Sequence, residues 1–188
     1  RRFCGVQDGE SAVAKSAKLA QRISHNLPAS MHQRVTEFIG ELCKVPGTDE
    51  PSPKLRAARQ NPRIMSDQLG LALLDFLRAE CQVRPVLLVL EDLHWGDKLS
   101  VRLVELALRG LTDQPLMVLA LARPEVDELY PRIWAGLTQQ ITLQSLSKRA
   151  RERLVQQVLG QQCSPATISR IVEQSAGNGL LLEELIRA

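Results

Sequence analysis

Aromatic residues are scarce in this chain, in which Phe, Trp and Tyr together make up 3% of 188 residues. A core of this composition must be built mainly from Leu, Val, Ile and Ala. Domains that stack bases on aromatic side chains need rings that are in short supply here. The net charge of +3 is also small, and the basic residues are interspersed with acidic ones. The composition therefore gives no support to direct nucleic-acid binding.

Metal-binding and redox patterns of cysteine are missing as well. The chain has four cysteines, with no C-x-x-C pair and no histidine cluster beside them. Such spacing argues against a zinc site or a redox motif and favours reduced thiols in a cytosolic protein. The cysteines are Cys4, Cys43, Cys81 and Cys163.

Long apolar runs are also absent. No apolar stretch reaches the roughly 18 residues of a membrane-spanning helix, so the sequence predicts none. The first residues, Arg1-Arg2-Phe3, include neither an initiator Met nor the apolar core of a signal peptide. We therefore expect a piece of a longer, cytoplasmic polypeptide.

The most informative stretch follows Pro85, where five apolar residues run directly into two acidic ones. This run at 86–90, rich in Val and Leu, predicts a strand buried on both faces of a parallel sheet. Glu91 and Asp92 would then lie at the carboxyl end of the strand, where open α/β sheets bind ligands. Mg²⁺ prefers such oxygen ligands together with phosphate and water, as in the Walker B element of nucleoside-triphosphate hydrolases. The phosphate-loop motif G-x-x-x-x-G-K-[ST] does not occur in the sequence.

The residues before this strand are predicted to be largely helical. Apolar residues at helical spacing predict helices over 11–27 and 30–43. The segment from Val45 to Pro62 contains four prolines and a glycine, which predicts a loop or linker. A third helix is expected over 66–82, with Ser66 as its N-cap.

After the strand, the pattern alternates in the α/β manner. A helix is expected between Asp97, its N-cap, and Gly110, the residue just past its end. A second strand is expected over 116–122 and a weak third one over 140–143. Between these two strands, residues 125–136 are expected to be a short helix or irregular.

From Ser147 onward the pattern is purely helical. Gly160 closes one helix, Ser164-Pro165 opens a second through N-cap and N1 chemistry, and Gly177-Asn178-Gly179 separates it from a third. These changes along the chain predict three parts. They are a helical segment and linker over 1–62, an α/β core over 63–145, and a small all-α subdomain over 146–188.

Three segments carry a resemblance to a known family: LLVLEDLHWGD at 87–97, LMVLALARPE at 116–125 and SAGNGLLLEEL at 175–185. In this order they resemble the AAA-type ATPase module of the STAND class of signal-transduction proteins. The likeness is closest to the ATPase part of large multidomain bacterial serine/threonine protein kinases. It implies an α/β fold with a partial P-loop-NTPase-like parallel sheet, flanking helices and a helical lid over 146–188.

The resemblance also implies roles for particular residues. Glu91 and Asp92 would be the Walker B pair, of which one organises Mg²⁺ and the other polarises the attacking water. Arg123, at the end of the next strand, would match the sensor of the γ-phosphate of ATP, since a guanidinium can bond phosphate bidentately. Gly177-Asn178-Gly179 would match the lid turn that approaches the nucleotide. The last glycine of this turn stands where the family has proline, which departs from the pattern at the adenine contact.

The family's phosphate loop and first strand precede the part that this chain matches. That strand would lie between the strands at 116–122 and 140–143, so we expect exposed strand edges and weak or no ATP binding by this chain alone. ATP and Mg²⁺ are thus expected as cofactors of a longer parent ATPase. The implied partners are kinase, cyclase or DNA-binding output domains of the same polypeptide, with a homo-oligomer as a further option.

Two other functions stay open. The chain could be a non-catalytic interaction module, in which amphipathic helices bind partners and the acids at 91–92 have no role. More remotely, four side chains could form the metal site of a phosphohydrolase that binds metal without a nucleotide. These four are Glu91, Asp92, His94 and Asp97.

Several residues also have a purely structural interpretation. His94 is expected to be a satisfied, partly buried histidine beside Trp95. Arg123 could pair with Glu125 or Asp127 on the surface instead of sensing phosphate. A basic run in the predicted linker is expected to be a solvated loop. This run is Lys54, Arg56, Arg59 and Arg63.

Overall fold

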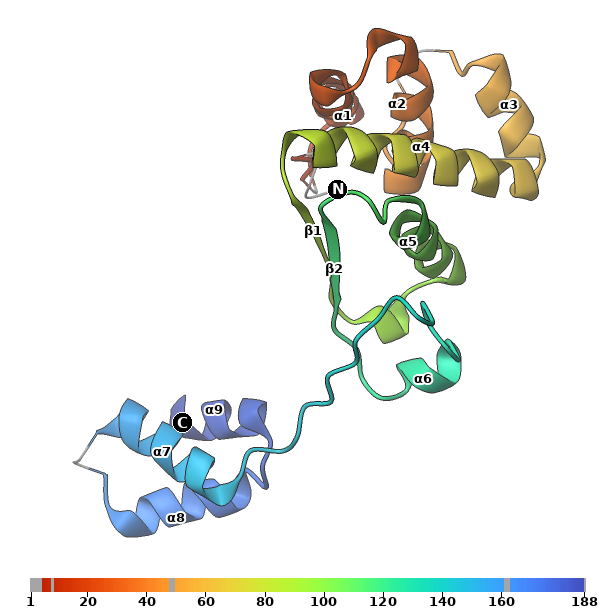
Figure 1. Cartoon of the computed structure of the whole chain (residues 1–188). Helices are drawn as coiled ribbons and strands as arrows, with labels where there is room; N and C mark the ends of the chain where they lie inside the picture. The colour runs from red at the N-terminus through yellow and green to blue at the C-terminus, as the bar shows by residue number, and fades with distance from the viewer. Residues whose placement is uncertain (1–4, 8, 48–49, 161–162, 188) are drawn as a thin grey trace. The chain divides into compact units, whose positions relative to one another are not determined.

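The computed structural model describes residues 5–7, 9–47, 50–160 and 163–187 (Figure 1). The chain divides into two compact units, residues 1–138 and 139–188. Cys4 and the start of the chain lie outside the described residues, and Cys81 and Cys163 are free thiols. Within the described residues, no helix combines the length and the apolar character needed to cross a bilayer.

The first unit places four helices before a small sheet and one helix between its strands. Before the sheet come α1 (Ala12–Asn26), α2 (Ala29–Cys43), α3 (Pro53–Gln60) and α4 (Pro62–Val83). They are followed by β1 (Val86–Leu90), the 3₁₀ turn η2 (Leu93–Trp95), α5 (Lys98–Gly110), β2 (Leu116–Ala120) and α6 (Val126–Leu129).

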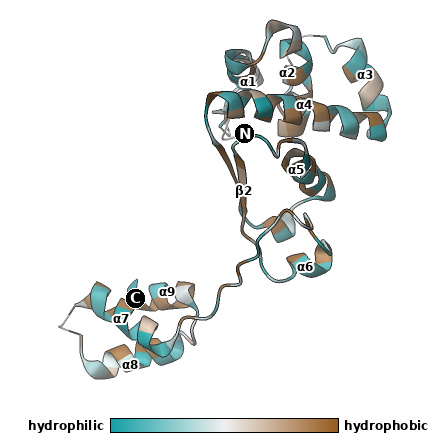
Figure 2. Cartoon of the chain, viewed as in Figure 1, coloured by the Kyte–Doolittle hydropathy of each residue, from teal (hydrophilic) through white to brown (hydrophobic). Residues whose placement is uncertain are grey.

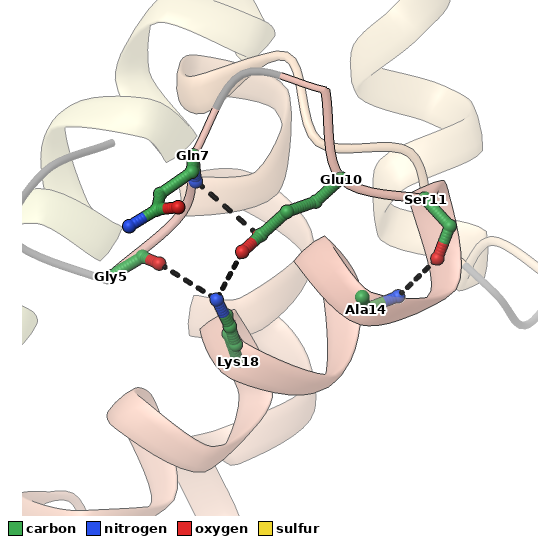
Figure 3. Close-up of polar contacts among 6 residues, drawn as sticks. All are labelled: Gly5, Gln7, Glu10, Ser11, Ala14 and Lys18. Carbon is green, nitrogen blue, oxygen red and sulfur yellow. Dashed lines mark hydrogen bonds and ion pairs between the residues drawn. The ribbon is translucent and has the colours of Figure 1, made fainter.

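The first two helices form where the apolar spacing predicts them. Ser11 caps α1 by accepting a hydrogen bond from the N–H of Ala14 at 3.2 Å. Beside this cap, the Glu10 carboxylate accepts hydrogen bonds from Lys18 and from the N–H of Gln7 (Figure 3). The hydrogen bond from Lys18 is the main reason why the pKa of Glu10 lies below its usual value. The polar residues before α1 thus fix the point at which the helix starts.

The predicted linker from Val45 to Pro62 is wrong, because α3 lies within it. Ser52 caps this helix and Pro53 occupies its first turn, where a proline costs no hydrogen bond. The Glu37 carboxylate of α2 accepts hydrogen bonds from the N–H and hydroxyl of Ser52, at 2.9 and 2.5 Å. Leu55 and Ala58 are buried in the core shared by α1 to α4. Pro53 and Pro62, which favour a linker by composition, therefore lie in the first turns of α3 and α4.

The basic run is exposed to solvent as expected, but it lies on helices and not in a loop. Lys54, Arg56 and Arg59 lie on α3, and Arg63 lies in the first turn of α4. Arg56 pairs with Glu50 at 2.9 Å, and Arg59 pairs with Glu41 at 2.6 Å. Arg56 and Arg59 thus link α3 to the segment before it and to α2.

The predicted start of the next helix is also wrong, because α4 begins at Pro62 and Ser66 lies inside it. The N-cap is Asn61, whose side-chain oxygen accepts hydrogen bonds from the N–H groups of Arg63 and Ile64, at 3.0 and 3.3 Å. Asn61 and Ser66 can both cap a helix, and the helix starts at Asn61, which is followed by Pro62. The end of α5 differs slightly too, since Gly110 is its last residue and Leu111 its C-cap.

The sheet consists of β1 and β2, which pair in parallel from Val86 opposite Leu116 to Leu90 opposite Ala120. Both strands are confirmed, and the architecture is mixed α/β. One face packs on α4 and α5, where Val86 joins Leu77 and Ala107. The colouring of Figure 2 shows how apolar β2 is.

The predicted burial of both sheet faces is wrong. The alternate side chains of the two strands are open to solvent, with Leu87 55% exposed, Val89 49%, Met117 63% and Leu119 42%. The physical reason is that α4 and α5 cover the same face, and no helix among the described residues of the first unit covers the other. A run that is apolar at every position therefore gives one covered and one bare apolar face, called the bare face below.

The predicted third strand at 140–143 is not formed. These residues have no regular secondary structure, and Ile141 and Leu143 are exposed. A short apolar run becomes a strand only by pairing with another strand, and it has no such partner within the described residues.

The second unit consists of α7 (Lys148–Leu159), α8 (Pro165–Gln174) and α9 (Gly179–Arg187). The predicted cap Ser164 is confirmed at the start of α8, and Ser147 caps α7. Gly160 ends α7 with φ +71°, a conformation that glycine adopts without strain. The core of this unit is formed by Val155, Ile171, Val172 and Leu182.

Candidate functional site

The ends of β1 and β2 are held together beyond the strands themselves. The N–H of Leu121 donates to the carbonyl of Leu90 at 2.8 Å, and the N–H of Leu93 donates to the carbonyl of Leu121 at 2.9 Å. One residue pair further on, the N–H of Arg123 donates to Nδ1 of His94 at 3.3 Å. The segments that follow the two strands therefore run side by side at the same edge of the sheet.

The two acids lie at this edge. The chain turns sharply at Asp92, which adopts a left-handed backbone conformation with φ +52°. Its carbonyl accepts a hydrogen bond from the N–H of Trp95 at 2.8 Å, which closes the turn into η2. The side chains of Glu91 and Asp92 are exposed and form no hydrogen bond or ion pair with the described residues. Their carboxylates are accessible to a cation from solvent.

Arg123 lies on the neighbouring segment, as its position after β2 predicts. Its side chain is exposed and forms no ion pair with any residue that the structure describes. The surface pairing of Arg123 with Glu125 or Asp127 is therefore not observed. The main chain of Arg123 is fixed on both sides, because its carbonyl accepts a hydrogen bond from the N–H of Val126 at 3.0 Å.

His94 links the acidic turn to Arg123, and the sequence did not indicate this role. Its ring is buried and lies against Trp95, with ring centroids 5.0 Å apart. Nδ1 accepts the hydrogen bond from Arg123, whereas Nε2 is buried and has no partner among the described residues. The prediction of a satisfied histidine beside Trp95 is thus correct for one ring nitrogen. The signal that could have found the link is the position of both residues just after neighbouring parallel strands.

Asp97 is used to cap α5, as predicted. Its carboxylate accepts hydrogen bonds from the N–H and the hydroxyl of Ser100, at 2.9 and 2.8 Å. These two hydrogen bonds hold the pKa of Asp97 below its usual value. The carboxylate therefore serves the start of α5 rather than the surface where Glu91 and Asp92 lie.

Side chains that come after β2 support the loop that carries the acids. The hydroxyl of Tyr130 donates to the carbonyl of Gly96, and Nε1 of the buried Trp134 donates to the carbonyl of Val101 at 3.0 Å. Trp134 also packs in the cluster with Leu93. The loop between β1 and α5 is therefore braced by the segment around α6.

The four side chains proposed for a phosphohydrolase do not gather into a metal site. Over residues 5–7, 9–47, 50–160 and 163–187, no group of three His, Cys, Asp or Glu side chains is placed to hold a metal ion. An ion at Glu91 and Asp92 would need its other ligands from water and from a bound phosphate.

The turn at Gly177-Asn178-Gly179 belongs to the second unit and has a full structural explanation there. Gly177 has φ +88°, and a Cβ at this position would lie 2.9 Å from Cβ of Ser145. The carbonyl of Gly177 accepts a hydrogen bond from the N–H of Leu146 at 3.0 Å. The side-chain oxygen of Asn178 accepts from the N–H of Leu180 at 3.0 Å and so caps α9. The turn is shaped by the packing of this unit on residues 145–146.

Comparisons of the chain with protein-family models, with curated proteins and with solved structures find no match.

Proposed function

We propose that the chain is part of an ATP-dependent regulatory switch, in which Glu91 and Asp92 hold Mg²⁺ and Arg123 contacts the terminal phosphate. The observation that carries this proposal is the parallel pairing of β1 with β2. It puts two carboxylates and one guanidinium, none of which has a side-chain partner among the described residues, at the carboxyl edge of the sheet, where α/β sheets bind ligands. A cation site beside an anion-binding group is what Mg·ATP requires.

The expected affinity is low. Backbone N–H groups of a phosphate loop, together with its lysine, normally supply much of the binding to the β- and γ-phosphates. The sequence has no such loop. In a longer parent protein, nucleotide binding would change how the helical lid over 146–188 meets the α/β core. That change would pass to a kinase, cyclase or DNA-binding output domain.

Paramagnetic NMR tests the proposal at low affinity. The ¹⁵N-labelled chain is titrated with Mn²⁺·ATP, because Mn²⁺ takes oxygen ligands like those of Mg²⁺ and broadens nearby amide signals. We expect broadening of the amide signals of residues 90–96 and 121–123, and its loss in Asp92→Asn. The matched control is Asp113→Asn, which removes an exposed acid just before β2, at the other end of the sheet. Broadening that is unchanged in Asp92→Asn, or absent from residues 90–96, would contradict the proposal.

A non-catalytic interaction module is the second candidate function. The observation that favours it is the bare face, on which Leu87, Val89, Met117 and Leu119 form an apolar surface. Such surfaces mark interaction sites more often than isolated exposed apolar residues do. If this function is correct, Asp92→Asn leaves self-association of the chain unchanged, whereas a charged side chain on the bare face abolishes it. Sedimentation velocity would measure both effects.

A further inference from the structure

The main chain of Arg123 has unusual hydrogen-bond partners for a residue that follows a strand. Pairing with the β1 segment by main-chain groups ends at Leu121, whose N–H and carbonyl are both used. The N–H of Arg123 instead reaches a side chain, Nδ1 of His94. Pro124 follows and has no N–H, so the next residue cannot donate a main-chain hydrogen bond. The hydrogen bond to His94 therefore holds the chain against the β1 segment just before Pro124.

The chemistry of this hydrogen bond fixes the form of the ring. A backbone N–H can only donate, so Nδ1 must accept and the single proton of the neutral imidazole lies on Nε2. This Nε2–H is buried without a partner among the described residues. An unpaired buried donor is costly, and structures keep such groups where something else depends on them. Here the position of Arg123 depends on the orientation of the His94 ring.

We propose that His94 is a positioning residue of the site, which clamps the main chain of Arg123 to the turn that carries Glu91 and Asp92. With the carbonyl of Arg123 bonded to Val126 as well, both main-chain groups are fixed and only the side-chain torsions stay free. The side chain of Arg123 therefore extends from a fixed backbone position beside Glu91 and Asp92. This role rests on the proposed function, in which Arg123 contacts the terminal phosphate of ATP. His94 would keep Arg123 in position for that contact.

Two substitutions distinguish the role of Nδ1 as a hydrogen-bond acceptor from the role of the His94 ring in filling space. His94→Phe keeps a buried aromatic ring beside Trp95 and removes the acceptor. His94→Asn is smaller but puts its side-chain oxygen near the place of Nδ1, so it can accept from Arg123. If His94 only filled space, the Phe variant would resemble the unsubstituted chain and the Asn variant would be the impaired one.

Amide hydrogen exchange, followed by NMR residue by residue, tests the clamp directly. In His94→Phe we expect exchange at the N–H of Arg123 to rise about tenfold, the effect of losing one hydrogen bond. The N–H of Leu121, which donates to the carbonyl of Leu90, serves as the internal reference and should not change. His94→Asn should restore slow exchange at Arg123. Unchanged exchange at Arg123 in the Phe variant, or an equal rise at Leu121, would overturn the proposal.

A second readout keeps the clamp separate from the proposed function. On addition of Mn²⁺·ATP, broadening at Glu91 and Asp92 should persist in His94→Phe, because the acids are intact. With Mg·ATP, the shift of the Arg123 Nε–Hε signal should disappear in His94→Phe and return in His94→Asn. A shift that persists in His94→Phe would show that Arg123 needs no clamp. If the unsubstituted chain gives no response to either complex, the proposed function fails, while hydrogen exchange still confirms or overturns the clamp.

Discussion

Arg22 on α1 forms an ion pair with Glu80 on α4, and the side chain of Glu80 is fully buried at this contact. Asn26, one turn along α1, donates a second hydrogen bond to the same carboxylate at 2.8 Å. Arg84 lies near the carboxylate at 3.9 Å. A buried anion in this position ties the first helix to the helix that leads directly into β1.

Removing the positive partner of this buried anion should destabilise the first unit strongly. Arg22→Ala leaves Glu80 charged and poorly compensated, so we expect the free energy of unfolding to fall by about 3 kcal/mol. Urea unfolding measures the change. The matched control is Arg56→Ala on α3, whose partner Glu50 is exposed, with an expected loss below about 1 kcal/mol. Equal losses in the two variants would contradict this account.

The N-cap of α5 should contribute stability that depends on pH. Asp97→Ala should lower the free energy of unfolding by about 1 kcal/mol near neutral pH. The folded chain holds the pKa of Asp97 below its usual value, so this contribution is present above the unfolded pKa of about 3.9. It should disappear as the pH falls through the lower, folded pKa. Unfolding curves at several pH values test this, and Asp97→Asn, which caps without charge, should show no such loss.

Gly177 should tolerate a side chain less well than another glycine of the same unit. In Gly177→Ala, the left-handed conformation costs about 1–2 kcal/mol, and the new methyl group meets Ser145 at 2.9 Å. Gly179 is the matched control in the same unit, because it has no positive φ and a Cβ there would meet Leu146 only at an ordinary 3.5 Å. Thermal unfolding should place the midpoint of Gly177→Ala clearly below that of Gly179→Ala. Equal midpoints would show that the backbone of Gly177 and the contact with Ser145 relax freely.

The bare face should drive self-association of the isolated chain at high concentration. Leu87→Lys combined with Leu119→Lys should reduce association in sedimentation velocity and change the free energy of unfolding by only about 0.5 kcal/mol per site, because both side chains are exposed. Leu88→Lys is the matched control, since it puts a lysine on the covered face, where Leu88 packs against the cluster that contains Val86 and Leu111. The Leu88→Lys variant should unfold at a much lower urea concentration than the unsubstituted chain. If the double variant associated as strongly as the unsubstituted chain, the bare face would not be responsible.

Local signals predicted most helices, because a cap and an apolar stripe are contained in a few consecutive residues. Ser11, Asp97, Ser147 and Ser164 all cap the helices that their neighbours suggested. The same local chemistry misled where two signals competed. Pro53 and Pro62 favour a linker by composition, although a proline in the first turn is compatible with a helix.

Features that depend on distant segments could not be predicted from apolar runs alone. Whether both faces of β1 are buried depends on where α4 and α5 pack, which the run at 86–90 does not encode. In the candidate site, the position of Glu91, Asp92 and Arg123 at one edge followed from two predicted parallel strands. The contact from His94 to Arg123 did not, because it depends on how far each chain continues past its strand.

The parallel pairing of β1 and β2 also sets how the charged cluster forms and is lost. Two parallel strands can meet only after the chain has crossed between them, here through α5, so the acids and Arg123 become neighbours in a single closing event. When β2 detaches by local unfolding, Arg123 leaves the acids and His94 at the same moment. The cluster therefore has a lifetime of its own, set by how long one short strand stays paired rather than by the lifetime of the whole fold.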